Sequence, residues 1–144
     1  MRIFFVVGLL FSLFSGCAEE VAMEKLQGRW GAQSVVHPDS SWTLKLDTCG
    51  LEIMFFPCSQ PYTATCFLEM REQGMGGHVW VDTLGYTIKG DELAFVDGSV
   101  KTKSVFSNTL FRLRRFRWSI HEEMHLDLKR IDTSIIEFRF SKLE

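Results

Sequence analysis

Apolar and polar residues alternate strictly in the last third of the chain. In 124–129 (MHLDLK) and in 136–141 (IEFRFS), every second residue is apolar. A period of two places the apolar side chains on one face of an extended chain, so both segments are predicted to be half-buried β-strands. Asp132 and Thr133 lie between them and supply the connecting turn.

Short runs rich in Phe, Val, Ile, Thr and Trp fill most of the remaining chain, and turn residues separate them. They predict strands over 28–36, 51–56, 65–72, 78–89, 92–96, 109–120, 124–130 and 134–141, with a short extended piece at 42–46. Many short strands at close, even spacing are typical of an all-β sandwich or barrel.

The run 109–120 changes its inward face part-way along. Phe111 and Leu113 share one parity, whereas Phe116, Trp118 and Ile120 share the other. One extra residue at the intervening arginine pair 114–115 would form a β-bulge, and we expect one there.

Cysteine positions predict one disulfide. Cys58 and Cys66 are expected to face each other across a hairpin, where two cysteines lie within bridging distance. That register pairs two further residues of each strand: Phe56 with Leu68, and Met54 with Met70. A bridge from Cys49 to Cys58 would require the ends of an extended run to meet, so Cys49 is left as a spare thiol or a buried apolar residue.

The first twenty residues predict that the protein is exported. Arg2 precedes an apolar run over 3–13, which ends in small residues before Cys17. This layout is typical of a secretory signal, and the run is shorter than the roughly 20 residues that a spanning helix needs. An ordinary cleaved signal with an incidental cysteine is the simpler alternative.

The same segment resembles the lipobox of bacterial lipoproteins, in which the cysteine is lipidated and becomes the new N-terminus. The resemblance implies a signal peptide over 1–16, a lipidated Cys17 with a short acidic tether over 17–25, and one folded domain over 26–144. The protein would then be held by acyl chains in the bacterial cell envelope, at the outer membrane, on its periplasmic face or at the cell surface.

Charge argues against a nucleic-acid partner. The formal net charge is −2, whereas nucleic-acid-binding domains are basic. Four arginines over 112–117 form the one local exception. A solvated strand face explains them, and contact with an anionic ligand or partner is the alternative.

The opening of the domain, Gly28-Arg29-Trp30, resembles the Gly-x-Trp motif of lipocalins. The ending Trp-x-Ile, Leu-x-Leu, Phe-x-Phe is also similar to a lipocalin-type barrel. This resemblance implies a single antiparallel up-and-down barrel of about eight strands. It further implies that Gly28 permits the opening turn, that Trp30 closes the barrel base, and that Arg139 or Arg130 packs over the indole by cation–π contact.

The segment 121–125 (HEEMH) matches His-Glu-x-x-His, which on a helix would bring two imidazoles onto one zinc ion. The flanking residues alternate with period two, which predicts strands instead, and residues four apart in one strand lie roughly 13 Å from each other. We therefore expect solvent-facing hairpin residues here, with no metal site and no catalytic residues. No cofactor motif is apparent either, so the protein is expected not to be an enzyme.

Two functions fit this sequence. A lipocalin-like barrel would bind a small apolar or amphipathic ligand, and the aromatic residues expected to line its cavity are Trp42, Trp80, Phe95 and Trp118. Alternatively, the barrel has a solid core and serves as an interaction or inhibitor module for another protein of the envelope.

Overall fold

The computed structural model describes residues 23–36, 43–45, 50–58, 65–74, 76–96, 111, 114–131 and 136–143. They form nine strands: β1 (Gly28–Val36), β2 (Thr43–Lys45), β3 (Glu52–Phe55), β4 (Cys66–Gln73), β5 (Val79–Lys89), β6 (Glu92–Val96), β7 (Arg115–His121), β8 (His125–Arg130) and β9 (Glu137–Leu143). Among the described residues, no helix has the length and apolar character needed to cross a bilayer.

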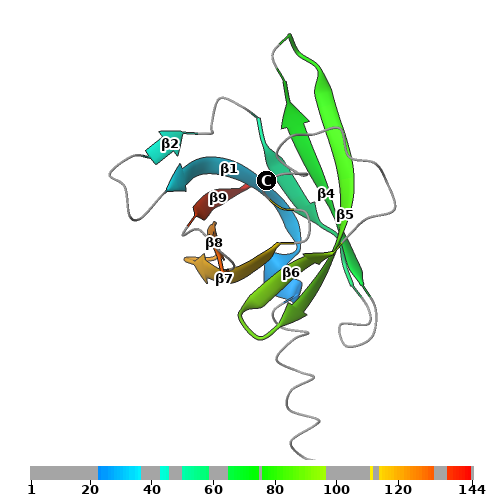
Figure 1. Cartoon of the computed structure of the whole chain (residues 1–144), viewed down its shortest axis with the longest axis vertical. Helices are drawn as coiled ribbons and strands as arrows, with labels where there is room; N and C mark the ends of the chain where they lie inside the picture. Colours follow the sequence, from blue (N-terminus) through cyan, green and yellow to red (C-terminus); the bar gives the residue numbers. More distant parts are fainter. Residues whose placement is uncertain are drawn as a thin grey trace, which may run out of the picture.

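Eight of the strands close into an antiparallel ring (Figure 1). The order runs from β1 through β3 to β9, and β9 pairs back onto β1 over the length of both strands. The short β2 lies outside the ring order, because it pairs with the end of β1 while β3 pairs with its beginning. The predicted all-β, up-and-down barrel of about eight strands is confirmed.

A bulge in β1 keeps its apolar residues inside. The register against β9 shifts between Ala32 and Ser34, and the extra residue Gln33 is exposed. The buried positions therefore pass from Trp30 and Ala32 to Val35, which a regular alternation would not allow.

The bulge expected at residues 114–115 was a wrong prediction. Strand β7 begins only at Arg115, and its register against β6 is regular. Phe111 is completely buried but lies outside any strand. Its burial therefore does not indicate which face of β7 points inward. Residues 112–113 are outside the described part of the chain.

The predicted disulfide is confirmed, but the predicted register is wrong by one residue. Cys58 and Cys66 are bonded, with their Cα atoms 5.6 Å apart. Phe55 pairs with Leu68, which turns Phe55 inward where Phe56 was expected. Ile53 likewise replaces Met54 opposite Met70. The reason is that the bridge joins residues that are offset by one position rather than directly opposed.

Aromatic rings fill the middle of the barrel. Phe95, Phe111, Phe116, Phe138 and Phe140 form a chain of ring contacts, with centroids 4.8 to 6.4 Å apart. We call these five residues the aromatic core. Such offset and edge-to-face arrangements add to the stabilisation that comes from burying the rings.

Tyr86 belongs to the same interior, on the β3–β4 side. Its ring meets Phe55 edge to face, with the centroids 5.2 Å apart. Because burial disfavours the charged phenolate, it raises the pKa of Tyr86 to about 12.

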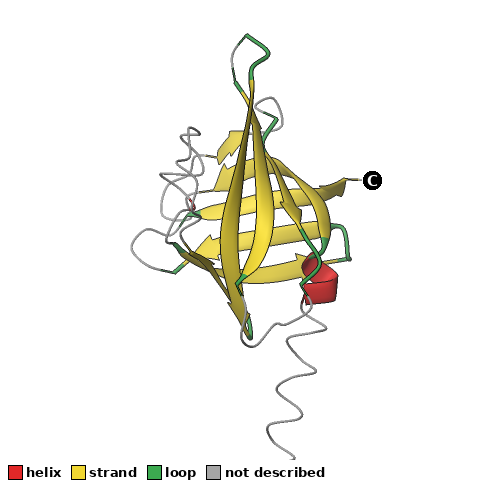
Figure 2. Cartoon of the chain, turned by 90° about the vertical axis from the view of Figure 1, so that its right-hand side faces the viewer, coloured by secondary structure: helices red, strands yellow, loops and turns green. Residues whose placement is uncertain are grey.

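The two ends of the barrel differ. The base is the end where β1 begins; it carries the turn at Gly90-Asp91, the turn over 122–124 and the disulfide. A helical turn over 23–26 lies at this end, coloured red in Figure 2. At the far end, the β4–β5 hairpin projects beyond the other strands (Figures 1 and 2).

Candidate functional site at the barrel base

The helical turn partly plugs the base. Met23 and Leu26 are buried, and Met23 Sδ lies 3.8 Å from Cys66 Sγ of the disulfide. Trp30 Nε1 donates a hydrogen bond of 2.8 Å to the carbonyl oxygen of Leu26. The chain then enters β1 through Gly28, whose φ of 112° is a conformation that side-chain-bearing residues rarely adopt. Gly28 and Trp30 thus lie at the base, as the motif implies.

Lys142 is the cation over Trp30. Its Nζ lies 5.4 Å from the centroid of the indole. Neither of the two expected residues, Arg139 and Arg130, is the one found there. Arg139 instead pairs with Glu137 at 3.0 Å, and its side chain is 53% exposed. Strand parity explains this correction: Phe138, Phe140 and Lys142 alternate onto the inward face, so Arg139 must face outward.

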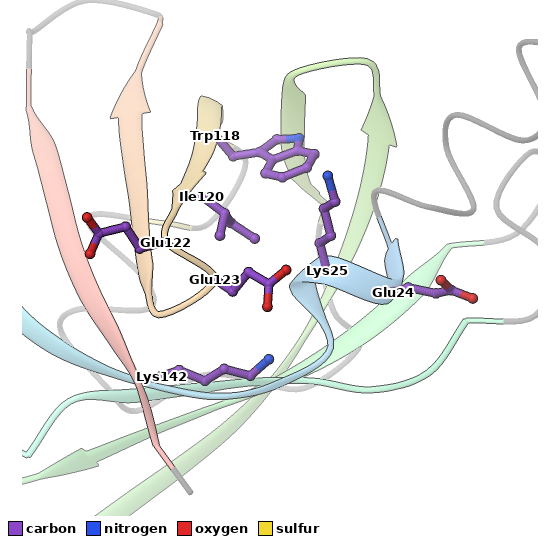
Figure 3. Close-up of a pocket in the computed structure, with 7 residues that line it drawn as sticks. All are labelled: Glu24, Lys25, Trp118, Ile120, Glu122, Glu123 and Lys142. Carbon is purple, nitrogen blue, oxygen red and sulfur yellow. The ribbon is translucent and has the colours of Figure 1, made fainter.

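Next to this plug lies a pocket of about 460 Å³, which we call the base pocket. Its lining residues come from the helical turn, β7, the β7–β8 turn and β9: Glu24, Lys25, Trp118, Ile120, Glu122, Glu123 and Lys142. Figure 3 shows Lys25, Glu123 and Lys142 directed toward the space beside Trp118 and Ile120, whereas Glu122 and Glu24 are directed away from it.

The base pocket is amphipathic. Trp118 and Ile120 are half-buried and form an apolar surface. Trp118 Nε1 donates a hydrogen bond of 3.2 Å to the carbonyl oxygen of Gly90, which fixes the orientation of the ring. Lys25, Lys142 and Glu123 place charges of both signs beside this surface. An aromatic or short alkyl group can therefore stack on Trp118 while a charged group meets an opposite charge at the rim.

The turn that carries Glu123 has an uncommon backbone. Glu122 and Glu123 have φ values of 52° and 58°, and Met124 N–H donates to the carbonyl of His121 at 3.2 Å. Two successive positive φ values are typical of a type I′ turn, which favours Asn and Gly. Glutamates here are strained, and such strain is frequent in residues that serve a function.

Of the four aromatic residues predicted to line a cavity, the three that the structure describes are not brought together. Trp118 lines the base pocket. Phe95 is buried in the aromatic core and lies about four strand positions, roughly 13 Å, from Trp118. Trp80 is 39% exposed near the tip of the projecting hairpin. Trp42 and the predicted lipidation site Cys17 lie outside the described residues.

Sequence reasoning missed Lys25, Ile120, Glu123 and Lys142 as pocket residues. One signal was present for Lys142: it continues the inward series of Phe138 and Phe140, and a lysine at an inward position next to a strand end indicates a polar opening. The contributions of Lys25 and Glu123 depend on how the helical turn and the hairpin turn pack, and no local pattern encodes that.

The histidines of the His-Glu-Glu-Met-His segment lie on two strands, not on a helix. His121 ends β7, His125 begins β8, and the two are direct cross-strand partners. The helical zinc arrangement is therefore not formed. The expected separation of roughly 13 Å is wrong, however, because the chain turns between the two residues.

Two of the four arginines over 112–117 are paired with carboxylates. Arg115 bonds to Glu92 at 2.6 Å, and Arg117 pairs with Asp91 at 2.9 Å. These exposed pairs fit a solvated strand face, and Arg112 lies outside the described residues.

A smaller pocket of about 170 Å³ lies on the outer face of β1, β3 and β4. Its charged residues also pair among themselves, Arg29 with Glu52 at 2.6 Å and Arg71 with Glu69 at 3.5 Å. The hydrogen bond and charge of Glu52 raise the pKa of Arg29. The two arginines and two glutamates of this pocket balance each other in charge.

Solved structures decide the kind of fold. A lipocalin-like protein from Bacteroides uniformis superposes with a TM-score of 0.64 at 15% identity, covering 83% of this chain and 99% of that one. The fold is lipocalin-like. A protein from Bacteroides eggerthii has a TM-score of 0.59 at 14% identity, covering 82% and 99% of the two chains. A redesigned β-barrel reaches 0.50 at 13% identity, covering 85% and 96%. No protein-family model and no curated protein matches the sequence.

At these identities the likeness concerns the lipocalin-like architecture alone.

Proposed function

We propose that this protein is a lipid-anchored, non-catalytic lipocalin-like protein of the bacterial envelope that captures a small apolar or amphipathic molecule in its base pocket. The observation that carries the proposal is the juxtaposition of Trp118 and Ile120 with Lys25, Lys142 and Glu123. A pocket of about 460 Å³ is within the usual range for small-molecule sites.

The position of the pocket supports the anchored form of the proposal. The helical turn that borders the pocket begins six residues after Cys17. A chain of that length reaches at most roughly 20 Å, since an extended residue spans about 3.3 to 3.6 Å. With acyl chains on Cys17, the base pocket would lie close to the membrane surface, where amphipathic molecules concentrate.

Native mass spectrometry and a probe titration test ligand capture. Protein purified without detergent should carry a co-purifying small molecule. Dodecanoate, dodecylamine and dodecanol are then titrated while tryptophan emission is recorded. We expect saturable binding at least to one charged probe that is stronger than binding to dodecanol.

Two tryptophan variants locate the binding. Trp118→Ala should abolish the titration, whereas Trp80→Ala, at the opposite end of the barrel, should retain it. Binding that survives Trp118→Ala, or no binding of any probe together with no co-purified molecule, would refute capture in the base pocket.

The anchor is tested separately. Radiolabelled palmitate should be incorporated by the full chain and lost in Cys17→Ser. Efficient secretion of an unlabelled, soluble product from the wild-type chain would instead support an ordinary cleaved signal.

A second function has its own supporting observation. The described interior is occupied by aromatic rings in mutual contact, while Val79 and Val81 are at least half exposed on the outer face of β5. An envelope protein could dock on this apolar surface, with the barrel as a solid support. In-cell crosslinking should then give a partner that is lost in Val79→Ser/Val81→Ser and retained in Trp118→Ala.

A further inference from the structure

The two histidines of the β7–β8 hairpin are not part of the base pocket. Trp118 and Ile120 face inward, so Ser119 and His121 face outward by strand alternation. His125 and Asp127 continue this outward face on β8. A site on this outer face is therefore independent of ligand capture.

The hairpin places the two imidazoles within reach of each other. His121 and His125 are directly opposed, and both are exposed. Directly opposed residues have Cβ atoms about 4.5 to 5.5 Å apart. Two imidazole nitrogens that bind one metal ion at 2.0–2.1 Å are separated by roughly 3.3 Å, which side chains on such Cβ atoms can achieve.

A carboxylate already stands beside the first histidine. Asp127 Oδ2 lies 3.3 Å from His121 Nε2, and Ser119 Oγ lies 3.3 Å from the same nitrogen. Asp127 is diagonal to His121 across the two strands, on the same face. Two imidazoles and one carboxylate oxygen form a donor set that suits Zn²⁺, Cu²⁺ and Ni²⁺.

We propose that His121 and His125 form a binding site for a divalent transition-metal ion on the outer face of the hairpin, with Asp127 as the third ligand. Among the described residues, no three such side chains yet converge on one point. The exposed side chain of His125 must therefore rotate toward His121 when the ion binds. This site clamps two strands, and it differs from the helical catalytic arrangement that the sequence motif suggests.

The turn favours this site in two ways. Its hydrogen bond from Met124 N–H to the carbonyl of His121 fixes the register that opposes the histidines. Glu122 also points away from the base pocket, so it does not draw the proposed cation toward the pocket's own charged residues.

Metal titration of the protein, purified without a histidine tag, tests the proposal. Calorimetry with Cu²⁺ should show one saturable site, and the electron paramagnetic resonance spectrum should show coupling to two imidazole nitrogens. His121→Ala and His125→Ala should each weaken binding at least about tenfold, since even loss of a residue that only supports a ligand costs 10- to 100-fold. His78→Ala, which removes a histidine from the opposite end of the barrel, is the matched control and should bind as the wild type does.

Thermal unfolding gives a second readout. Zn²⁺ should raise the Tm of the wild type and of His78→Ala but not of His121→Ala, because an ion that binds only the paired strands stabilises the folded state. Binding that is unchanged in both His121→Ala and His125→Ala, or no saturable binding, would overturn the site. Unchanged affinity in Asp127→Asn would overturn the assignment of the third ligand.

Discussion

Strand β7 runs from the aromatic core into the base pocket, and the contrast between these two regions separates stability from binding. Phe116, Trp118 and Ile120 share the inward face of the strand. Phe116 is completely buried among Phe95, Phe111 and Phe138, whereas Trp118 and Ile120 meet lysines and glutamates. One alternating pattern thus supplies a solid interior at one point and an amphipathic opening two residues later.

Side-chain truncation should lower the free energy of unfolding most in the aromatic core and much less in the base pocket. Phe116→Ala is expected to lower the free energy of unfolding by about 3 to 5 kcal/mol, because it leaves a cavity among packed rings. Trp118→Ala should cost only roughly 1 to 1.5 kcal/mol, since part of the indole is already in water. Urea denaturation measures both, and equal losses would erase the distinction.

Removal of the disulfide weakens the base without touching the aromatic core. Cys58→Ala/Cys66→Ala is expected to lower the free energy of unfolding by roughly 2 to 3 kcal/mol, the range for closing a short loop. Chemical denaturation with and without reductant measures the loss. The reductant should lower the stability of the wild type and leave the double variant unchanged; a wild type that is insensitive to complete reduction would contradict this expectation.

Relief of strain at the β7–β8 turn should stabilise the base. Glu122→Asn/Glu123→Gly supplies the residues that a turn with two positive φ values favours, and a gain of about 1 kcal/mol is expected. Glu122→Gln/Glu123→Gln removes the charges but keeps the strain, so it is the control and should give no such gain. A gain of equal size in the control would assign the effect to charge.

The contact between Lys142 and Trp30 is expected to contribute less. A double-mutant cycle of Lys142→Gln with Trp30→Leu should give a coupling of about 0.5 to 1 kcal/mol, the lower part of the range for cation–π contacts, because Lys142 is only half-buried. The matched cycle with Arg139→Gln should give a coupling near zero, because Arg139 faces outward. A larger coupling for Arg139 would restore the original expectation.

Ionisation of Tyr86 should leave the free energy of unfolding unchanged at neutral pH and lower it only at alkaline pH. Its pKa of about 12 in the folded state exceeds the ordinary value of 10.0. The neutral phenol therefore stabilises the fold fully below pH 10, and this contribution is lost as the pH rises toward 12. Phenolate absorbance in a Tyr62→Phe background measures the ionisation, and Tyr86→Phe should make stability less sensitive to pH in that window. Ionisation near pH 10 with the fold intact would contradict the burial argument.

The sequence predicted the bounds of most strands. The bounds of β1 and β6 agree with the expected 28–36 and 92–96, and the remaining strands except β7 agree within a few residues. Strand β7 begins at Arg115 instead of residue 109, because Phe111 is buried without being part of a strand. An apolar residue in the sequence therefore predicts that its side chain is buried, but it does not predict that its backbone pairs in a β-sheet.

The candidate site was predictable only in part. Trp118 was expected as a ligand residue, but Phe95 and Trp80 do not join it, since aromatic residues in a small barrel also serve the core and the surface. The cation over Trp30 is Lys142 because the inward-facing positions of β9 alternate from Phe138, and this series includes Lys142 but not Arg139. The resemblance to lipocalins predicted a cation–π contact on Trp30, and the alternation of side chains along β9 determines that Lys142 makes it.

Closure of the ring by the pairing of β1 with β9 has a consequence for biogenesis. Strand β1 emerges from the ribosome or a translocation channel well before β9, and until β9 follows, the edge of β1 that β9 pairs with stays uncovered. Such long-range pairing slows folding, and an uncovered edge can recruit other chains. A nascent or truncated chain that lacks β9 should therefore depend on chaperones that shield exposed strands.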